Sequence, residues 1–492
     1  MLRNRLTTCA APVAVTMLAL AVRIHGLGDK PFWLDEILTL LRSRLPLGDL
    51  VADALRNMHY PTYFLLLSPF AEADHAEWVL RAPSALFGAL CAGLACAIAQ
   101  AAKNGSAGLV AGLLTALSPF QVQFSQEARS YALVAALVLL ALWGLMRIAA
   151  AADRSEPPAM TPASRLPWIA YIGGTILALV VHSSAIMWLL AANFAALAIT
   201  LRRRRQRAEL VRAWLLAQGL VIGCWLPALL LVLPYMARTA VGDYWIPPAT
   251  AASIWTATKA VYLFRVSDSV MYELGPGTVP GLGALVALLA LIGMWQLRRQ
   301  PAAALVLLLA LLVLPAGLLI ASIYKPLFLP RYLLWTAPPL FVLAGIGLGS
   351  APRPVAVLAV PILGVVLAWN LLPYYTFESK PRWDLAARYI AAEARPGDVV
   401  LLRSFPERLI YRVYRDRFGP PLDAVPRVLE ASEAAAALEN GFRAWALSGR
   451  TGFGPLPTAA AYLQELDILG RPSRTRQFGA HVTVFRFDPK GG

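Results

Sequence analysis

Two adjacent carboxylates near the start of the chain are the residues best suited to acid–base chemistry. Asp35 and Glu36 follow the first apolar segment and are framed by Phe32, Trp33 and Ile37. Carboxylates among apolar residues at a membrane surface are costly unless they are used. Neighbouring helical residues point in different directions, so one acid can act as a general base while the other orients a partner or a cation. A simpler interpretation is that acids in a first turn complement the helix dipole.

A second group of polar residues lies in the segment 126–131. Glu127 is the only acid between Glu77 and Asp153, and Arg129 and Tyr131 follow it at the start of an apolar span. These residues could form part of a site. They could also be an N-terminal acid followed by an arginine and a tyrosine at the membrane interface.

Two cations flank a proline-stiffened apolar loop late in the chain. Lys325 and Arg331 lie in the segment 324–332, which Tyr332 closes. No Asp or Glu occurs from Leu274 to Phe377, so no acid nearby in sequence neutralises them. Fixed cations beside an apolar groove suit a lipid phosphate, whereas interfacial anchoring is the simpler interpretation.

Four further residues are weaker candidates. Arg81 opens an apolar span, where it could hold a phosphate or an acid, or could extend its charge to the membrane surface. His59 and Tyr63 lie between two amphipathic stretches, and His182 lies at the end of another span. A lone histidine is usually structural or solvated.

Composition places these residues in a membrane protein. The 492 residues are 58% hydrophobic and only 15% charged, against about 25% charged in a soluble domain. The net charge of +16 does not indicate nucleic acid binding, because the arginines cluster in short loops between apolar runs, where they set topology and meet anionic lipid. The four cysteines fall within apolar spans without metal-ligand spacing, so we expect no disulfide framework.

Eleven apolar segments approach the length of about 20 residues needed to cross a bilayer. We therefore predict an α-helical polytopic membrane protein with about eleven transmembrane helices. The predicted spans are 8–25, 79–101, 106–122, 130–151, 167–182, 184–201, 211–234, 281–297, 301–323, 331–349 and 352–371.

Arginines between the spans predict the orientation. A run from Arg202 to Arg207 lies between the sixth and seventh spans, and Arg298 and Arg299 lie between the eighth and ninth. The turn at 182–184, on the other side, has no Lys or Arg. The positive-inside rule then predicts a cytoplasmic N-terminus, with the acidic pair, the 126–129 loop and the C-terminus on the outer side.

The loops and the tail complete the predicted organisation. In the outer loop 26–78, the stretches 47–58 and 60–71 have apolar periodicity and should lie as helices on the membrane surface. Beyond the apolar spans, short strands alternate with helices, which predicts a small α/β domain. We therefore expect a transmembrane catalytic domain at 1–375 and an outward-facing α/β domain at 376–492.

No nucleotide-binding or hydrolase motif accounts for the polar residues. The chain has no Walker loop, no GxGxxG that follows a strand and opens a helix, no HExxH and no defensible Ser-His-Asp pattern. Chemistry outside the cytoplasm cannot draw directly on cytosolic nucleotides. A lipid-linked activated group is therefore the consistent donor.

Together these motifs resemble the GT-C-fold glycosyltransferases of the family (glycosyltransferase family 39-like) that includes protein O-mannosyltransferases and aminoarabinose transferases of lipid A. The resemblance covers roughly residues 1–375. Five motifs in matching order carry it, at 32–36, 59–63, 81–88, 126–131 and 330–333.

The resemblance implies inverting transfer of a sugar from a polyprenyl-phosphate donor on the periplasmic face of a bacterial inner (plasma) membrane. Asp35 would be the base on the acceptor hydroxyl, while Glu36 and Glu127 would orient the acceptor, the base or a divalent cation (Mg, Mn or Zn). Such a cation would have Asp35 and Glu127 as ligands. The acceptor would be a glycolipid, a glycan or a protein. The expected substrate-binding and phosphate-binding residues are Arg81, Arg129, Lys325, Arg331, Tyr332, His59 and Tyr63.

Two departures from the family pattern limit what is carried over. Tyr60 and Thr62 flank Pro61 where the family often has two prolines after the histidine, which leaves the role of His59 open. In the tail, Lys380-Pro-Arg-Trp-Asp384 has its charges exchanged relative to related bacterial members, so no tail function is predicted.

Two other function classes remain open from the sequence. A lipid-linked sugar transporter or flippase would also need outer cations and a groove, but it would place polar groups at mid-membrane depth, and the spans here are nearly free of acids. A binding or assembly protein would use the tail as its working part.

Overall fold

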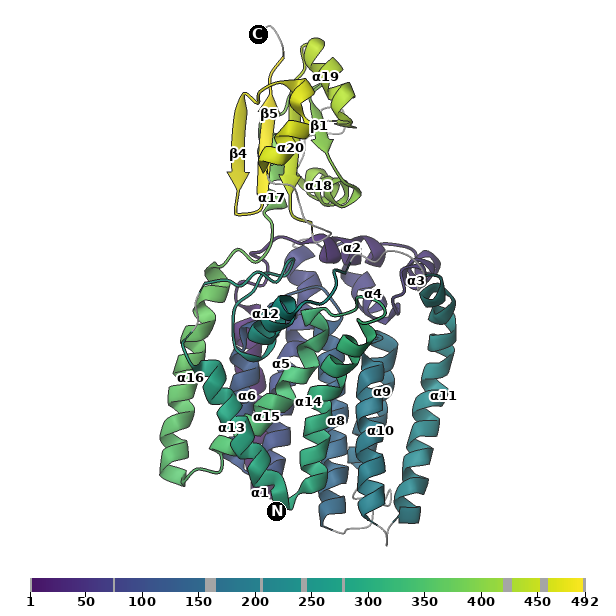
Figure 1. The fold of residues 1–492 in the computed structure, drawn as a ribbon, viewed down its shortest axis with the longest axis vertical. Helices are drawn as coiled ribbons and strands as arrows, with labels where there is room; N and C mark the ends of the chain where they lie inside the picture. The colour runs from purple at the N-terminus through teal and green to yellow at the C-terminus, as the bar shows by residue number, and fades with distance from the viewer. Residues whose placement is uncertain are drawn as a thin grey trace. The chain divides into compact units, whose positions relative to one another are not determined.

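In the computed structural model, long apolar helices form one unit and a five-stranded sheet with helices forms another (Figure 1). The membrane unit consists of Met1–Leu27, Arg42–Ser267 and Leu274–Phe377. The C-terminal unit consists of Gly28–Leu41, Asp268–Glu273 and Glu378–Gly492. The structure describes residues 2–73, 76–154, 165–203, 207–239, 246–276, 279–418, 427–451 and 459–489.

The membrane unit is built from long helices and several short ones. The long helices are α1 (Leu2–Ile24), α5 (Ala76–Ala102), α6 (Gly105–Leu117), α8 (Tyr131–Asp153), α9 (Arg165–Val181), α10 (Ala185–Arg202), α11 (Arg207–Thr239), α13 (Leu282–Gln296), α14 (Pro301–Ala321), α15 (Ala337–Leu348) and α16 (Arg353–Thr376). The short helices are α3 (Leu47–Arg56), α4 (Thr62–Leu67), η1 (Ser68–Phe70), α7 (Pro119–Ser125), α12 (Ala251–Tyr262), η3 (Leu297–Arg299) and η4 (Pro330–Thr336).

The apolar helices match the predicted spans. In the described part of the chain, eight helices are long and apolar enough to cross a membrane, and α6 with α7 adds one bent pair. Two shorter apolar helices, Ala10–Ile24 and Arg165–Val181, complete a set of eleven segments. All eleven coincide with the segments expected from the sequence, which confirms the polytopic helical fold.

The segment expected as one straight span at 106–122 is instead bent by 59° between α6 and α7. Pro119 causes the break, because proline disfavours a helical conformation at the preceding residue and has no N–H to donate. Arg23 on α1 satisfies carbonyls at the break, donating to the oxygens of Thr115 at 3.3 Å and Ala116 at 3.0 Å. It also donates to the hydroxyl of Ser125 at 3.0 Å, so a buried arginine ties α1 to both halves of the bent helix.

Small residues allow neighbouring helices to approach closely. A side chain at Gly144 on α8 would collide with the carbonyl oxygen of Pro167 at the start of α9. A side chain at Gly293 on α13 would collide with the carbonyl oxygen of Leu343 on α15. Close backbone contact of this kind is the usual basis of helix association in a membrane, where apolar burial gives no driving force.

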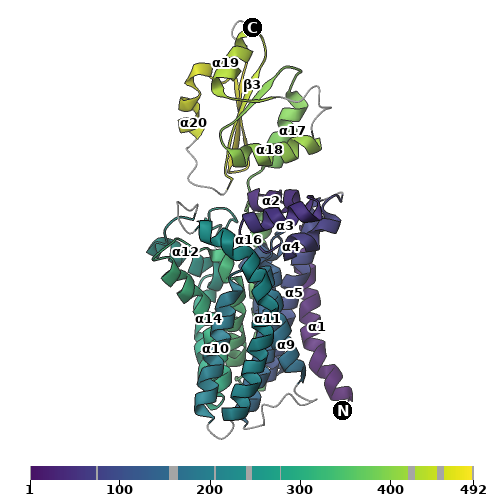
Figure 2. The ribbon, with the colours of Figure 1, turned by 90° about the vertical axis from the view of Figure 1, so that its right-hand side faces the viewer.

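The two ends of the helix bundle differ in their residues. The end of α10, the start of α11 and the α13–α14 connection lie at the lower end of the bundle in Figure 1, whereas α3, α4 and α12 lie at its upper end, and α1 is seen from the side in Figure 2. Arg202, Arg203 and Arg207 belong to the lower end, and residues 204–206 of the predicted arginine run lie outside the described part. The upper end carries the predicted surface helices.

The C-terminal unit holds a mixed sheet of order β2-β1-β3-β5-β4. β1 pairs in parallel with β2 and β3, and β5 pairs antiparallel with β3 and β4. Val399, Leu401 and Phe485 contribute to a core that the helices α19 and α20 cover. Its elements are α17 (Trp383–Glu393), β1 (Val399–Leu402), α18 (Phe405–Phe418), β2 (Arg427–Leu429), α19 (Ala431–Glu439), β3 (Ala444–Gly449), α20 (Ala459–Glu465), η6 (Asp467–Leu469), β4 (Arg474–Phe478) and β5 (Val482–Phe487).

Candidate active site

The acidic pair opens helix α2 (Leu34–Ser43), whose N-terminal part belongs to the C-terminal unit. The carbonyl of Trp33 starts the helix by accepting from the N–H of Glu36 at 2.9 Å and of Ile37 at 3.0 Å. Both acids therefore lie in the first turn, where the helix dipole favours their charge. Asp35 keeps 9% of its surface exposed, while Glu36 is wholly buried, so the two acids have different surroundings.

Glu36 forms a buried ion pair that the sequence did not reveal. Its Oε2 atom accepts from the ammonium of Lys380 at 2.7 Å, and both side chains are at most 4% exposed. Lys380 belongs to the charge-exchanged tail motif, to which we had assigned no role. A buried pair is weak evidence for stability in itself, but removing one partner leaves an uncompensated charge and is strongly destabilising.

Further hydrogen bonds fix the segment that leads into α2. The hydroxyl of Tyr414 on α18 accepts from the N–H of Phe32 at 2.6 Å. The ammonium of Lys30 donates to the hydroxyl of Ser379 at 2.9 Å. The acidic motif and the start of the tail are thus one structural element, although most of the chain separates them in sequence.

A second group of predicted residues gathers in the membrane unit around the ring of Tyr131, at the start of α8. The guanidinium carbon of Arg129 lies 5.6 Å from the ring centroid and that of Arg331 lies 6.0 Å from it. The rings of His182 and Tyr332 lie 5.7 and 6.3 Å from the same centroid and 5.3 Å from each other. We call these five residues the basic cluster.

Three separate connections bring the basic cluster together. Arg129 lies in the turn between α7 and α8, and His182 lies in the turn between α9 and α10. Arg331 and Tyr332 lie in η4, which Pro330 begins. Arg331 is buried at 4% exposure, whereas Arg129, His182 and Tyr332 are partly exposed.

The pKa of His182 lies well below its usual range. Desolvation by burial is the main cause, followed by the nearby His59, Arg129 and Arg331, and together they lower the pKa to about 3. Its Nδ1 atom accepts from the backbone N–H of Ser184 at 3.1 Å, which is compatible with a neutral ring protonated on Nε2. The positive charge of the cluster therefore comes from its arginines.

The motif around His59 is joined to the basic cluster. The hydroxyl of Tyr63 bonds to the hydroxyl of Ser84 at 2.7 Å, and Ser84 donates in turn to the carbonyl of Arg129 at 3.1 Å. The ring of His59 bonds to the carbonyl of Asn57 at 2.6 Å. His59 also acts electrostatically on His182, so four of the five predicted motifs meet at this end of the bundle.

Glu127 and its neighbour Gln126 lie buried in the turn before α8. Gln126 donates to the carbonyls of Arg23 at 2.9 Å and His25 at 2.7 Å, and its side-chain oxygen accepts from the hydroxyl of Tyr374 at 2.8 Å. These bonds tie the turn to α1 and α16, and the backbone of Arg129 closes it by donating to the carbonyl of Glu127 at 2.8 Å. The sequence had shown Gln126 only as part of a motif.

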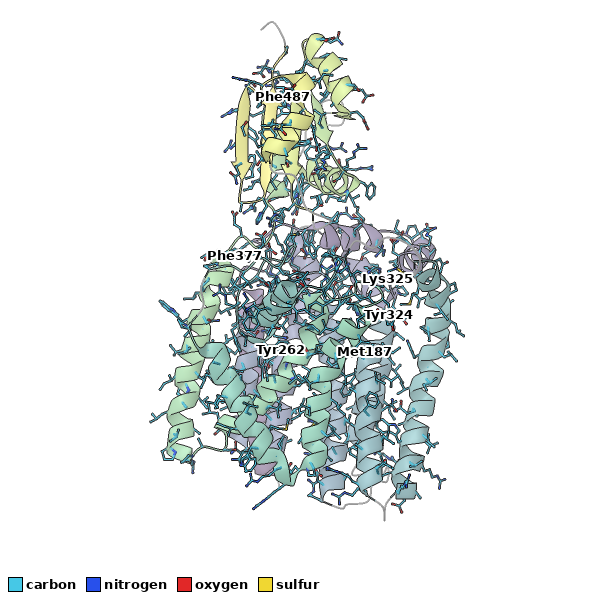
Figure 3. The ribbon with its side chains drawn as sticks, in the orientation of Figure 1. Met187, Tyr262, Tyr324, Lys325, Phe377 and Phe487 are labelled. Atoms are coloured by element: carbon cyan, nitrogen blue, oxygen red, sulfur yellow. The ribbon has the colours of Figure 1, made fainter. Side chains whose placement is uncertain are left out.

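Two predicted cations lie outside the basic cluster's ring contacts. Arg81 on α5 is buried and donates to the carbonyl of Leu27 at 2.9 Å, next to the segment that carries the acids. Lys325 is partly exposed in the loop between α14 and η4, and Figure 3 labels it beside Tyr324. Arg81 therefore supports the backbone that leads to α2, while Lys325 remains accessible.

In the parts of the chain that the structure describes, no group of three or more His, Cys, Asp or Glu side chains converges. Asp35 and Glu127, the two residues expected as cation ligands, belong to different compact units, and a cation between them stays a prediction.

Comparison with known proteins identifies the fold. No protein-family model and no curated protein sequence matches the chain. The structure is similar to ArnT from Cupriavidus metallidurans, with 14% identity, 96% of this chain and 97% of that one covered and a TM-score of 0.61. ArnT bound to undecaprenyl phosphate gives 15% identity, the same coverage and a TM-score of 0.54.

A second similar structure comes from an archaeon. The oligosaccharyltransferase AglB from Archaeoglobus fulgidus, in complex with an inhibitory peptide and a dolichol-phosphate, has 11% identity and a TM-score of 0.52 over 90% of this chain and 69% of that one. These likenesses confirm the expected architecture: the chain has the GT-C fold of membrane glycosyltransferases.

Proposed function

We propose that this protein is an inverting glycosyltransferase that moves a sugar from a polyprenyl-phosphate donor to an acceptor hydroxyl or phosphate on the periplasmic face of a bacterial inner membrane. The observation that carries the proposal is the basic cluster, in which Arg129 and Arg331 lie around one aromatic ring in a unit with the GT-C fold. The same fold is found in ArnT bound to undecaprenyl phosphate.

A lipid phosphate is a ligand that suits two arginines brought together from separate connections. The planar guanidinium can form two parallel hydrogen bonds with a phosphate. A neutral His182 carries no charge that would compete with the arginines for the phosphate. Lys325, in the accessible loop before η4, adds a third cation for the same phosphate. Tyr332, Tyr63 and His59 would line the sugar and the lipid phosphate.

The proposed reaction needs a base and a stabilised leaving group. Asp35, the more exposed acid of the pair, takes the proton from the acceptor hydroxyl as that oxygen attacks the anomeric carbon of the sugar. The bond between the anomeric carbon and the phosphate oxygen breaks, and the lipid phosphate leaves with the additional negative charge. Arg331, Arg129 and Lys325 stabilise that charge as it develops. Attack opposite the leaving phosphate inverts the anomeric carbon.

The other predicted residues support this arrangement. Glu36 and Glu127 are wholly buried, so we do not assign proton transfer to them. We assign to Glu36 the orientation of Asp35, and to Glu127 the orientation of the turn before α8. Arg81 holds the carbonyl of Leu27, where the chain leaves α1 for the acidic motif.

The orientation is part of the proposal. The arginines that end α10 and begin α11 belong to the end of the bundle opposite the basic cluster, as the positive-inside rule requires if that cluster faces the periplasm. A bacterial inner membrane supplies undecaprenyl-phosphate sugars on that face. The acceptor is a glycolipid, a glycan or a protein that reaches the same surface.

Release of the lipid phosphate tests the function without a chosen sugar. Free undecaprenyl phosphate is the common product from every undecaprenyl-phosphate sugar, so its release from a panel of donors and acceptors, measured by mass spectrometry, reports turnover. Asp35→Asn should abolish release while binding of undecaprenyl phosphate persists. Asp49→Asn, which changes an exposed acid in the first turn of α3, is the matched control and should transfer normally. Normal release by Asp35→Asn would remove the base assignment, and lipid movement across the bilayer without release would favour a transporter.

A further inference from the structure

A pocket lies at the end of α8 that is far from the basic cluster. α8 begins at Tyr131, in the cluster, and ends at Asp153. The pocket is lined by residues from the last part of α8 and from α5 and α14, which pack against it. Because α8 is one continuous helix of 23 residues, its two ends are about 33 Å apart. The pocket is therefore separate from the proposed transfer site.

The lining of this pocket combines an apolar wall with two arginines. Ile98 on α5 and Trp143 and Met146 on α8 belong to the apolar wall. Arg147 on α8 and Arg154, the residue that follows α8, line the same pocket and are both exposed. Seven residues make close to two helical turns, so the two arginines lie on one face of the helix, about 10 Å apart along its axis.

Arg147 lies within an apolar helix that is long enough to cross a membrane. It comes between one and two turns before the end of α8. A charged side chain at that depth is costly unless it extends to the membrane surface or meets an opposite charge. Among the residues that the structure describes, no carboxylate forms an ion pair with Arg147. An anion from outside the chain can supply that opposite charge.

The acid nearest in sequence to the two arginines has other partners. The carboxylate of Asp153 accepts from the backbone N–H of Ala302 at 3.2 Å and from that of Ala303 at 3.3 Å. It also lies 3.8 Å from the guanidinium of Arg203. The two hydrogen bonds hold the end of α8 against the start of α14, so they fix two walls of the pocket relative to each other.

We propose that this pocket binds an anionic phospholipid, with the phosphate at Arg147 and Arg154 and an acyl chain against the apolar wall. Guanidinium groups bind phosphate oxygens well, and basic pockets between membrane helices are typical sites for anionic headgroups. The apolar wall favours a lipid over a free phosphate ion. A lipid bound there contacts α5, α8 and α14 together and stabilises their packing. The proposal is independent of the proposed transfer reaction.

Binding of phosphatidylglycerol to the delipidated full-length protein in detergent, measured by native mass spectrometry, tests the charged part of the site. Arg147→Gln should raise the dissociation constant about fivefold, and Arg147→Gln/Arg154→Gln should raise it about 25-fold. Arg147→Lys keeps the charge and should retain most of the affinity. Arg353→Gln, at the exposed start of α16, is the matched control and should bind normally.

A pocket-filling variant tests the apolar part of the site without changing any charge. Ala101 is an exposed residue of α5 that lines the pocket, so a larger side chain there can be accommodated by the fold. Ala101→Phe should weaken binding of phosphatidylglycerol about fivefold although both arginines remain. Val357→Phe, on the exposed face of α16, is the matched control and should keep the wild-type affinity.

The choice of ligand decides between a lipid and a free anion. Wild-type protein should bind phosphatidylglycerol more tightly than phosphatidylethanolamine, whose headgroup also carries a positive charge. Equal affinities for the two phospholipids would overturn the proposal, as would inorganic phosphate that displaces phosphatidylglycerol completely at millimolar concentration. Wild-type affinity in the double arginine variant would also overturn it, because Arg147 then only extends its charge to the membrane surface.

Binding of the two lipids separates this pocket from the basic cluster. Arg331→Ala should leave the affinity for phosphatidylglycerol unchanged, and the double arginine variant should leave the affinity for undecaprenyl phosphate unchanged. Loss of phosphatidylglycerol binding in Arg331→Ala would place that lipid at the basic cluster and overturn the proposal. Unchanged binding of undecaprenyl phosphate in Arg331→Ala contradicts the proposed transfer site instead, so the two failures are distinguishable.

Discussion

The guanidinium of Arg331 lies 6.0 Å from the ring of Tyr131, although the two residues come from distant parts of the chain. Arg129 lies 5.6 Å from the same ring. The fold thus brings two arginines from separate connections to one aromatic ring. Preformed donors of this kind stabilise charge that develops on a leaving group at little cost of rearrangement.

Replacing Arg331 should weaken binding of the lipid phosphate. Arg331→Ala removes a buried guanidinium and the charge-assisted hydrogen bonds it can make, each worth about 1.5–3 kcal/mol, so the dissociation constant for undecaprenyl phosphate should rise at least tenfold. Binding can be measured by native mass spectrometry in detergent. Arg353→Ala, at the exposed start of α16, is the control and should bind normally. Unchanged affinity in Arg331→Ala would exclude the basic cluster as the phosphate site.

Lys325 should act on the donor and not on the acceptor. In Lys325→Ala the KM for the lipid-linked sugar should rise more than the KM for the acceptor, because the lysine is proposed to meet only the phosphate. Lys103→Ala, an exposed lysine after α5, controls for a general loss of positive charge. Equal losses for both substrates would argue against a phosphate contact at this position.

Gln126 should stabilise the membrane unit. Gln126→Leu removes three hydrogen bonds and leaves the hydroxyl of Tyr374 and two backbone carbonyls without this partner. Each buried polar group left unsatisfied costs about 1–3 kcal/mol, so the thermal unfolding midpoint in detergent should fall by several degrees. Gln477→Leu, on the exposed face of β4, should leave the midpoint unchanged. If both variants unfold at the wild-type temperature, the network does not hold the turn.

The buried acid Asp268 should make stability depend on pH. Burial raises the pKa of Asp268 to about 6 from 3.8, although the backbone N–H groups of Met271 and Glu273 donate to its carboxylate. A carboxylate whose pKa is raised on folding binds its proton more tightly in the native state. The contribution of Asp268 to the free energy of unfolding is therefore present below about pH 4 and is lost as pH rises through about 6. The free energy of unfolding changes by an amount on the order of 3 kcal/mol.

Asp268→Asn should remove that dependence. The amide oxygen can still accept both backbone hydrogen bonds, and Arg450 keeps its 2.7 Å contact with Glu273. The variant should match wild type near pH 4 and become the more stable protein above pH 6 in thermal unfolding. Asp416→Asn, an exposed acid of α18, is the control. A stability difference that does not grow with pH would show that Asp268 ionises normally in the folded protein.

The sequence predicted those parts of the fold that depend on local composition. The length of the apolar segments located the eleven apolar helical segments, and the alternation of short strands with helices beyond them predicted the α/β architecture of the C-terminal unit. The strand β4 was missed because its first four residues are all exposed and polar or charged, which leaves no alternating pattern. The bend before Pro119 was visible as a proline but not predicted, since many membrane helices tolerate proline without breaking.

The sequence allowed each motif of the candidate site to be predicted separately, but not the contacts between motifs. Charged residues isolated in apolar surroundings were conspicuous, and this found Glu127, Arg129 and Arg331. Pairings between distant segments could not be found in this way. Lys380 lies in an ordinary basic stretch of the tail, and only the folded chain shows that it reaches Glu36. Gln126 is an uncharged residue whose importance comes from three partners, two at the end of α1 and one on α16.

A structure of the protein bound to undecaprenyl phosphate, determined by electron cryomicroscopy, tests the central claim most directly. The proposed transfer predicts phosphate density within hydrogen-bonding distance, about 3 Å, of the guanidinium of Arg331 or Arg129. A phosphate held elsewhere in the protein would contradict it.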